Sequence, residues 1–355
     1  MTSFRMQTVE SAAPLERSPF EIPRARGSEV VLRVLAAGVC HTDLHLLDGF
    51  FDLGRGKRLN MAERGIRMPH TQGHETVGEV VAMGPDARDV AIGDRVLAYP
   101  WIGCGHCRRC TGGDGHLCAE PRFLGVFRDG GFATHLVVPD SHALFVLDAS
   151  MDAARIAPLA CAGLTAYSAL CKAKPALDDD TSLVIVGAGG LGLMALALMR
   201  LMDMPPAIVI EPSESKRRAA LELGACAAFD PSETGALAEG ASVVIDFVGS
   251  SSSVSNGCGM VRKGGKLIVV GMFGGELDVP IPALVLRALS LEGSYVGSLA
   301  EMRELLELVR ARGMPALPVA RRPLPEVNLV LDAMRRGEVI GRTVLVPQAA
   351  SKETM

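Results

Sequence analysis

The pattern of hydrophobic and polar residues changes near residue 150. Before that point, short runs rich in β-branched residues, such as 30–34, 76–81 and 135–138, alternate with turns that contain Gly, Pro or Asp. Runs of this kind predict the strands of a mostly antiparallel β domain. Segment 49–68 interrupts them with a polar stretch rich in Gly and Arg, which is long enough to form a functional loop or a lid.

From residue 181 onward, the pattern predicts alternating strands and helices. The expected strands are apolar at nearly every position, as strands buried on both faces are, and they cover 182–186, 207–210, 242–246 and 266–270. Helices are expected after the first strand and over 213–223. This alternation predicts an α/β fold with a doubly wound parallel sheet. The last part of the chain is expected to add a helix over 301–312 and a strand over 342–346.

The composition excludes several classes of protein. A length of 355 residues suggests about two domains, and 48% hydrophobic against 21% charged residues rules out global disorder. The net charge of −4 argues against nucleic acid or a membrane surface as partner, because both bind basic faces. Residues 1–18 lack an apolar signal core, and the longest apolar stretch, 191–202, is too short to cross a bilayer. We therefore expect a cytoplasmic protein, in which nine reduced cysteines point to metal binding or catalysis.

Residues 187–192, Gly-Ala-Gly-Gly-Leu-Gly, fit the dinucleotide fingerprint G-x-G-x-x-G. The motif follows an apolar strand and opens an apolar helix, so a pyrophosphate would meet free N–H groups at the positive helix end. Glu211 ends the next strand, where its carboxylate would accept from ribose hydroxyls and favour NAD over NADP. Two alternatives stay open: Glu211 only caps the next helix, or the basic residues 216–218 bind a 2′-phosphate. The cofactor residues predicted from the turn and this strand end are Gly187, Gly189, Gly190, Leu191, Gly192, Glu211 and Lys216.

Four cysteines lie close together in a glycine-rich stretch, at positions 104, 107, 110 and 118. Four thiolates can surround one tetrahedral ion, so Cys104, Cys107, Cys110 and Cys118 predict a structural zinc site. An iron–sulfur cluster is the main rival, although the bacterial ferredoxin run has a shorter last gap and a following Pro. Trp101, just before the cysteines, is expected to pack against them. Asp178, Asp179 and Asp180 are expected to form a solvated turn.

Three further segments, 38–45, 73–75 and 159–163, each offer a metal ligand. Cys40, His74 and Cys161 would form a Cys₂His zinc site with its fourth position open, which is the mark of a catalytic zinc.

Together, Cys-His-Thr-Asp-Leu-His at 40–45, Gly-His-Glu at 73–75, the four cysteines, Cys-Ala-Gly-Leu-Thr at 161–165 and the glycine turn resemble the zinc-dependent medium-chain alcohol dehydrogenases. The resemblance spans nearly the whole chain in order. It implies a GroES-like catalytic domain over 1–160 with two zinc sites. A Rossmann domain that binds NAD(H) would cover 161–297, and segment 298–355 would return to complete the first domain. It also implies a small alcohol or aldehyde substrate and a homodimer or homotetramer.

The resemblance assigns roles to further residues. Thr42 would take the alcohol proton and His45 would pass it to solvent. Glu75 would bind zinc transiently, and Asp43 would fix the tautomer of His74. Arg342 would contact the cofactor pyrophosphate. His41 receives no role.

Segment 49–68 departs from the common family pattern, because the gap between Cys40 and His74 is longer than in the short bacterial enzymes. Its five basic residues would attract a carboxylate, for instance on an ω-hydroxy acid, and the segment resembles a bacterial subgroup of 6-hydroxyhexanoate dehydrogenases. The alternative is a solvated loop that packs on a neighbouring subunit. For the whole chain, two other functions stay open: an NADP-dependent aldehyde reductase, or a dinucleotide-binding relative without catalytic activity.

Overall fold

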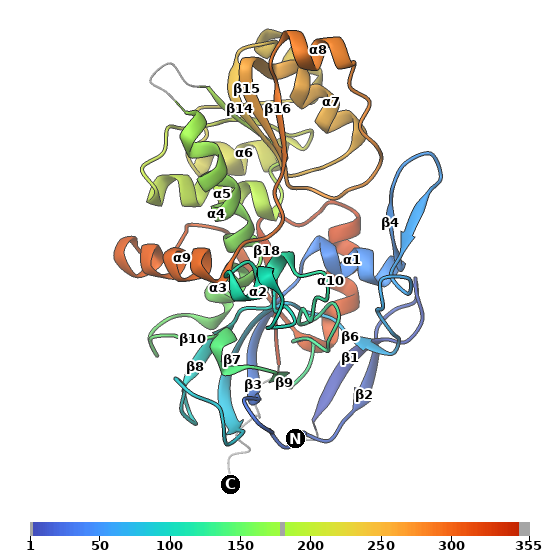
Figure 1. Cartoon of the computed structure of the whole chain (residues 1–355), viewed down its shortest axis with the longest axis vertical. Helices are drawn as coiled ribbons and strands as arrows, with labels where there is room; N and C mark the ends of the chain where they lie inside the picture. The colour runs from blue at the N-terminus through green and yellow to red at the C-terminus, as the bar shows by residue number, and fades with distance from the viewer. Residues whose placement is uncertain (1–2, 178–181, 348–355) are drawn as a thin grey trace.

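The chain folds around two large sheets, one mixed and one entirely parallel (Figure 1). The structure is a computed structural model that describes residues 3–177 and 182–347. The first sheet is mixed and has the strand order β10-β8-β7-β3-β18-β17, with β9 also paired to β3. Its strands are β3 (Val30–Gly38), β7 (Glu75–Met83), β8 (Arg95–Ala98), β9 (His135–Val138), β10 (Leu144–Val146), β17 (Val319–Pro323) and β18 (Arg342–Val346).

A small antiparallel sheet, β2-β1-β6, lies beside it; its strands are β1 (Phe4–Thr8), β2 (Glu16–Pro19) and β6 (His70–Thr71).

The second sheet is entirely parallel, in the order β13-β12-β11-β14-β15-β16. Its strands are β11 (Leu183–Val186), β12 (Ile208–Ile210), β13 (Ala227–Phe229), β14 (Ala241–Asp246), β15 (Val261–Val269) and β16 (Ser290–Gly293). Alternate residues of β11 enter two separate apolar clusters, Leu183 and Ile185 one of them and Val184 and Val186 the other. The central strand of the sheet is therefore buried on both faces, which explains why β11 is apolar at every position. This is the α/β, Rossmann-type sheet that the sequence predicts.

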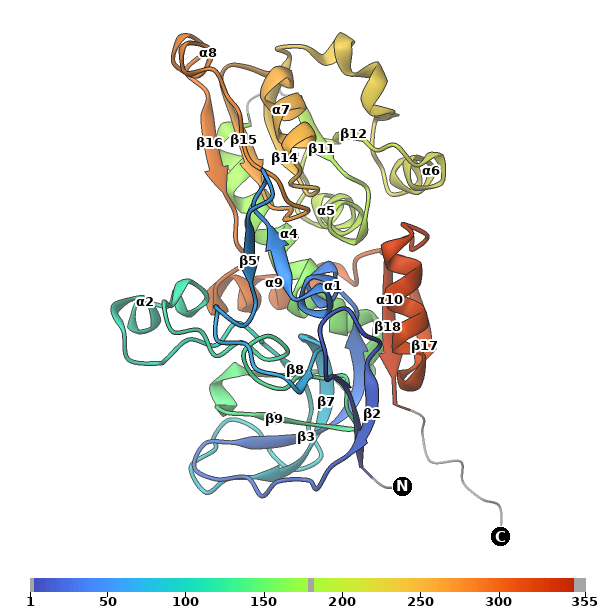
Figure 2. The same ribbon diagram turned by 90° about the vertical axis from the view of Figure 1, so that its right-hand side faces the viewer.

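Helices α4 (Ala162–Ala173), α5 (Gly190–Leu201) and α9 (Leu299–Arg312) pack against one another, and α7 (Ser251–Met260) packs on β14 and β15. Figure 2 shows α6 and α10 on the other side of the molecule from α2. The remaining helices are α1 (His41–Asp48), α2 (Arg108–Thr111), α3 (Ala153–Ile156), α6 (Glu214–Glu222), α8 (Ile281–Leu286) and α10 (Val327–Arg335).

The end of the chain returns to the first sheet. Strand β18 pairs antiparallel with β3, so that Val344 lies opposite Gly38 and Leu345 opposite Ala37. It also pairs in parallel with β17. Segments about 300 residues apart in sequence therefore share one sheet beside the metal-ligand candidates. The exact domain boundaries at 160/161 and 297/298 stay a prediction.

Segment 49–68 is partly ordered into a hairpin, β4 (Phe50–Asp52) paired with β5 (Arg58–Asn60). Its tip turns at Gly54 and Gly56, both with positive φ. In Figure 2 the hairpin rises from the first sheet towards the second. There the N–H of Gly275 donates to the carbonyl of Asp52 over 3.2 Å. The segment thus bridges the two parts of the chain, where the sequence pattern predicted a functional loop or a lid.

Within residues 3–177 and 182–347, no single helix has the length and apolar character to cross a membrane. The pair Ala153–Ala160 and Ala162–Ala176 meets that criterion only jointly and is bent by 50°. Its members are core helices, since most of α4 is buried. The predicted turn of Asp178, Asp179 and Asp180 lies outside the described residues.

Candidate functional site

Three separate elements bring the predicted metal ligands Cys40, His74 and Cys161 together. Cys40 follows β3 and is the N-cap of α1. His74 precedes β7, directly after Gly73, whose positive φ reverses the chain in a place where a Cβ would strike Phe132. Cys161 is the N-cap of α4. Each side chain therefore projects from the end of an element, where its position is fixed by the backbone of that element.

The three ligands and Glu75 form a cluster whose ligand atoms all lie within 4.8 Å of one another. The sulfurs of Cys40 and Cys161 are 4.0 Å apart. Cys40, His74 and Cys161 are 6%, 1% and 5% exposed. Both ring nitrogens of His74 and Oε2 of Glu75 are buried without a hydrogen-bond partner. Burying polar atoms without a partner is costly in free energy. The cluster therefore has the ligand atoms of a metal site, together with buried polar atoms that a metal ion would satisfy.

The charges around the cluster favour a bound cation. A hydrogen bond from Cys161 lowers the pKa of Cys40 well below its ordinary value, despite the opposing effect of burial, and favours the thiolate that binds metals. Burial acts against a charge on His74, but the carboxylate of Asp43, 3.7 Å from Nδ1, raises the pKa of His74 well above its usual range. Residues 40, 74 and 161 thus fit one zinc ion.

Asp43 is held in place by the backbone. One carboxylate oxygen accepts from the N–H of Cys40 over 2.8 Å, and the other from the N–H of Gly73 over 3.3 Å. Asp43 therefore links the two ligand-bearing turns as well as facing His74. The 3.7 Å separation from Nδ1 is an ion-pair distance and too long for a hydrogen bond.

Glu75 and Arg342 form a buried ion pair beside the cluster. Oε1 of Glu75 also accepts from the N–H of Ala162 over 3.3 Å, which leaves Oε2 free to face the ligands. Burial raises the pKa of Glu75, and the Arg342 guanidinium opposes that rise. Gly38 makes room for this carboxylate, because a Cβ there would meet Oε2 at 2.0 Å.

The second metal-ligand candidate is the four-cysteine loop around α2. Its sulfurs lie 3.5 Å apart for Cys107 and Cys110, 3.8 Å for Cys107 and Cys118, and 3.9 Å for Cys104 and Cys110. Four thiolates about 2.3 Å from a tetrahedral zinc are about 3.8 Å from one another. The loop thus has the spacing of a closed zinc site. Backbone N–H groups of His106 and Cys107 lower the pKa of Cys104 to about 6, which favours its thiolate.

The glycine turn lines a cavity of about 220 Å³ between the two sheets. A Cβ at Gly192 would lie 1.9 Å from the carbonyl oxygen of Gly187, so the first turn of α5 requires glycine there. A Cβ at Gly189 would meet nothing within 4 Å and would project into open space. The turn can therefore accept a dinucleotide phosphate close to its backbone. All the predicted cofactor residues line this cavity: Gly187, Gly189, Gly190, Leu191, Gly192, Glu211, Lys216 and Arg342.

Glu211 does more than the predicted ribose contact. Its two oxygens accept from the N–H groups of Ala188, over 2.8 Å, and Ser213, over 3.0 Å. The carboxylate thus fixes the glycine turn and also holds Ser213, the N-cap residue of α6, and each oxygen keeps a lone pair for a ribose hydroxyl. Of the basic residues that follow, Lys216 lines the cavity, whereas Arg217 pairs with Asp230.

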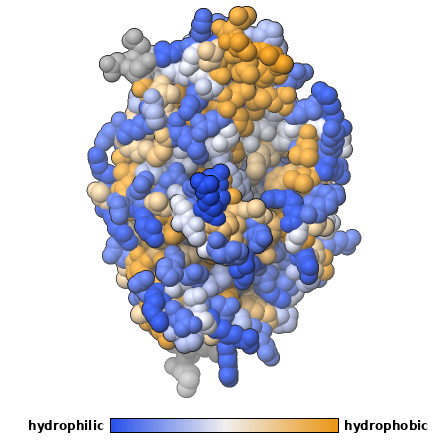
Figure 3. All heavy atoms as spheres, in the orientation of Figure 1, coloured by the Kyte–Doolittle hydropathy of each residue, from blue (hydrophilic) through white to orange (hydrophobic). Residues whose placement is uncertain are grey.

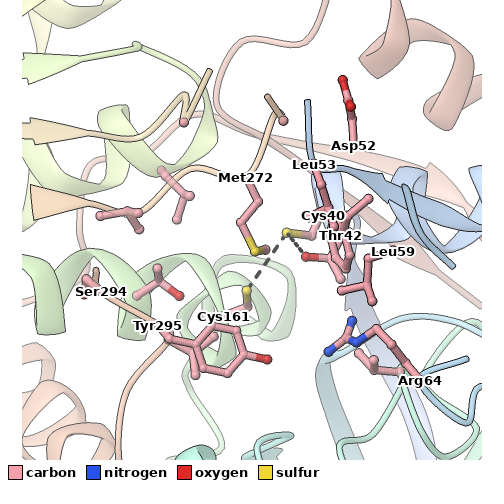
Figure 4. A pocket seen from close by; sticks show the side chains of 18 of the residues that line it. Cys40, Thr42, Asp52, Leu53, Leu59, Arg64, Cys161, Met272, Ser294 and Tyr295 are labelled. Carbon is pink, nitrogen blue, oxygen red and sulfur yellow. Dashed lines mark hydrogen bonds between the residues drawn. The ribbon is translucent and has the colours of Figure 1, made fainter. Parts of the chain in front are cut away.

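A larger cavity, of about 430 Å³, adjoins the first and shares Cys40, Thr42 and Leu191 with it. Figure 4 shows the sulfurs of Cys40 and Cys161 facing each other there, with Thr42 beside Cys40. The second predicted proton carrier, His45, lines the smaller cavity one turn along α1 from Thr42, with its ring 4.8 Å from that of Phe51. Of the predicted catalytic residues, Thr42 and His45 therefore border the two adjoining cavities, whereas Asp43 and Glu75 are not among the lining residues.

Trp101, Thr165 and His41 line these cavities, although the sequence analysis assigned none of them a catalytic or cofactor role. Trp101 was expected to pack on the cysteine loop, but its ring lines the larger cavity, 5.4 Å from the His74 ring, and Nε1 donates to the carbonyl of Ala160. Thr165 has a buried hydroxyl without a partner, and His41 lines the smaller cavity. The motif Cys-Ala-Gly-Leu-Thr already contained Thr165, whereas no local signal marked Trp101 as a cavity residue.

Comparison with known families identifies both parts of the chain. Residues 26–148 match the alcohol dehydrogenase GroES-like domain, and residues 190–311 match the zinc-binding dehydrogenase family. An NAD-dependent alcohol dehydrogenase of Sulfurisphaera tokodaii is 33% identical over 351 residues, which cover 96% of this chain and 99% of that relative.

A solved structure and a further relative agree with this family assignment. The crystal structure of the alcohol dehydrogenase from Aeropyrum pernix superimposes with a TM-score of 0.88 at 33% identity, covering 97% of this chain and 100% of that one. An L-threonine 3-dehydrogenase of Caldanaerobacter subterraneus is 30% identical and covers 92% of this chain and 94% of the relative. Relatives at similar identity thus act on different substrates.

The Cys₂His cluster predicts that His74→Ala abolishes NAD+-dependent alcohol oxidation while NAD+ binding persists, because the glycine turn is untouched. Absorbance at the NADH band measures alcohol oxidation, and calorimetric titration measures NAD+ binding. His142→Ala, which removes an exposed imidazole, should retain activity. Full turnover by the His74→Ala protein would contradict the assignment.

The four-cysteine loop predicts that Cys107→Ser lowers the melting temperature by roughly 10 °C, since a lost structural metal removes folding free energy. Differential scanning calorimetry measures the shift. Cys226→Ser, at an exposed cysteine outside both clusters, should melt with the wild type. Equal melting of both variants would show that the loop binds no structural metal.

Proposed function

The chain belongs to the zinc-binding alcohol dehydrogenases, and we propose that it transfers a hydride from an alcohol to NAD+, giving an aldehyde or ketone and NADH. The observation that carries this proposal is the buried Cys40–His74–Cys161 cluster at the junction of two cavities. When bound, zinc supplies Lewis-acid chemistry at the alcohol oxygen, and NAD+ supplies the hydride acceptor.

The residues around the cluster would position the alcohol and carry its proton. Thr42 lines both cavities, so its hydroxyl can accept the alcohol proton on one side and release it on the other. His45 follows one helical turn later, and burial lowers its pKa, which keeps the imidazole neutral and able to accept a proton. Trp101, whose ring lies against those of His74 and Phe123, would cover the reacting atoms with apolar surface and help to exclude water.

Glu75 and Asp43 would hold the ligand set without reacting with the substrate. Asp43 faces His74 at ion-pair distance and fixes the turns that carry Cys40 and His74. Glu75 presents one free oxygen to the ligands while Arg342 balances its charge. This arrangement would let Glu75 contact zinc when the substrate position empties.

NAD is proposed as the cofactor in preference to NADP. The buried carboxylate of Glu211 stands at the strand end where the adenosine ribose would bind, and it would repel a 2′-phosphate. Lys216 is the feature that favours the alternative, an NADP-dependent aldehyde reductase. A relative without catalytic activity is disfavoured because every predicted zinc ligand lies in one of the two clusters. A cytoplasmic location is proposed because both clusters need reduced cysteines.

A homo-oligomer is proposed from one exposed apolar face. Ile281, Val285 and Leu286 of α8 are 74%, 68% and 72% exposed, and Figure 3 shows hydrophobic residues gathered at this end of the molecule. Faces of this kind mark protein interfaces. Light scattering should give two or four times the chain mass of 37.4 kDa. Val285→Asp should lower that mass and Val9→Asp should not, whereas a monomeric wild type would contradict the proposal.

The proton-transfer role predicts that Thr42→Val lowers kcat/KM for alcohols by at least about 100-fold, because the variant keeps the shape of the side chain but cannot accept a proton. Thr42→Ser should restore most of the activity. Initial rates of NADH formation at saturating NAD+ measure both. A Thr42→Val protein with wild-type rates would remove Thr42 from the mechanism.

A further inference from the structure

The tip of the β4–β5 hairpin is docked on loop 274–276. The N–H of Gly275 donates to the carbonyl of Asp52 over 3.2 Å. Gly54, at the turn of the hairpin, is buried against the same loop. A Cβ on Gly54 would meet the backbone nitrogen of Glu276 at 2.9 Å and the carbonyl carbon of Gly275 at 3.0 Å. The hairpin and the loop therefore meet backbone to backbone, at a distance that only glycine permits.

Loop 274–276 is anchored to the side of the molecule that carries the parallel sheet. The N–H of Gly274 donates to the carbonyl of Gly249 over 3.1 Å, and the N–H of Glu276 donates to Oγ of Ser251 over 3.0 Å. Both acceptors lie at the start of α7, which packs on β14 and β15. The docking surface for the hairpin thus belongs to the cofactor side of the cleft.

The hairpin itself is held more weakly. Its strands β4 and β5 pair over three residues each, and a two-stranded hairpin alone is marginally stable in water. Arg55 at the tip forms an ion pair with Glu276, but the two side chains are 73% and 37% exposed, and exposed ion pairs contribute little. The contact between the hairpin and the loop can therefore break and re-form without disturbing either sheet.

The docked hairpin forms one wall of the larger cavity. The lining residues from the hairpin are Phe51, Asp52, Leu53 and Leu59, and those from the loop are Gly274 and Gly275. Met272, just before the loop, lines both the larger cavity and the cofactor cavity. The contact thus spans the cleft in which both cavities lie.

The chain itself crosses between the two sheets on the other side of this cleft. It leaves the first sheet after β10 to enter the second at β11, and it returns after β16 to reach β17. These crossings contain α4 and α9, which pack against each other. Figure 1 shows α9 at the left of the molecule and the hairpin at the right. The cleft is therefore tied covalently on one side and by the docked hairpin on the other.

We propose that the hairpin, residues 50–60, is a strap that holds the two parts of the chain closed around NAD(H), so that undocking of its tip from loop 274–276 sets how fast NADH leaves. This inference rests on the proposed function, which supplies NADH as the product. While docked, the strap keeps the cleft closed during hydride transfer. Undocking lets the cleft widen about the crossings that contain α4 and α9.

Gly54 and Gly56 provide a matched pair of variants for the test. Both have positive φ, 82° and 73°, so alanine strains the backbone at either position. At Gly54 the new Cβ would also strike the loop, whereas at Gly56 it would meet nothing within 4 Å. Stopped-flow fluorescence of the zinc-loaded enzyme should show NADH leaving Gly54→Ala at least about fivefold faster than the wild type, and leaving Gly56→Ala within about twofold of it.

A disulfide across the contact should have the opposite effect. A Cβ on Gly54 would lie 3.1 Å from the Cβ of Glu276, close to the roughly 3.5–4.5 Å of a disulfide. The double variant Gly54→Cys/Glu276→Cys, oxidised as its NADH complex, should release NADH at least about tenfold more slowly than its reduced form, and its kcat for alcohol oxidation should fall with that rate. Glu276→Cys alone, taken through the same oxidation, controls for the cysteines of the metal sites and should keep its release rate.

Equal NADH dissociation from Gly54→Ala and Gly56→Ala would overturn the strap, as would a disulfide, verified by mass spectrometry, that leaves NADH release unchanged. If Gly54→Ala fails to fold, the comparison of the oxidised and reduced double variant still decides. A wild type that binds no NADH would instead contradict the proposed function.

Discussion

The buried ion pair between Glu75 and Arg342 joins the parts of the chain on which the site depends. Arg342 opens β18, the strand that returns from the end of the chain to β3, and Glu75 opens β7 on the other side of β3. The same arginine packs against Gly190 in the glycine turn, and Glu75 faces the Cys₂His cluster. Removing either partner would leave a buried charge unpaired, which typically costs 3–5 kcal/mol. The Glu75–Arg342 ion pair thus connects the strand that returns to the first sheet, the cofactor cavity and the metal ligands.

Much of this arrangement could be predicted from the sequence because the signals were local. Apolar runs gave the parallel strands, the glycine spacing gave the turn before α5, and the cysteine spacing gave the loop around α2. Cys40, His74 and Cys161 are far apart in sequence, and their assembly rested on the family resemblance together with the residue types. The structure brings them within one cluster.

What the sequence could not provide depends on which side of an element a residue faces. Trp101 stands next to the cysteine loop in sequence, yet its ring turns towards His74. The basic residues of segment 49–68 were equivalent by pattern, yet Arg64 lines the larger cavity whereas the others are exposed. The Glu211 carboxylate was expected at a ribose, but its contacts with Ala188 and Ser213 show that it also holds the turn. Long-range packing decides each of these cases.

The central claim is that Cys40, His74 and Cys161 hold a zinc ion at the junction of the two cavities, apart from the ion in the cysteine loop. Anomalous X-ray diffraction from crystals of the zinc-loaded protein, recorded on both sides of the zinc absorption edge, tests it most directly. The account predicts two zinc peaks per chain, one among these three residues and one among the four thiolates of Cys104, Cys107, Cys110 and Cys118. A peak only at the four thiolates, with none between Cys40 and Cys161, would contradict it.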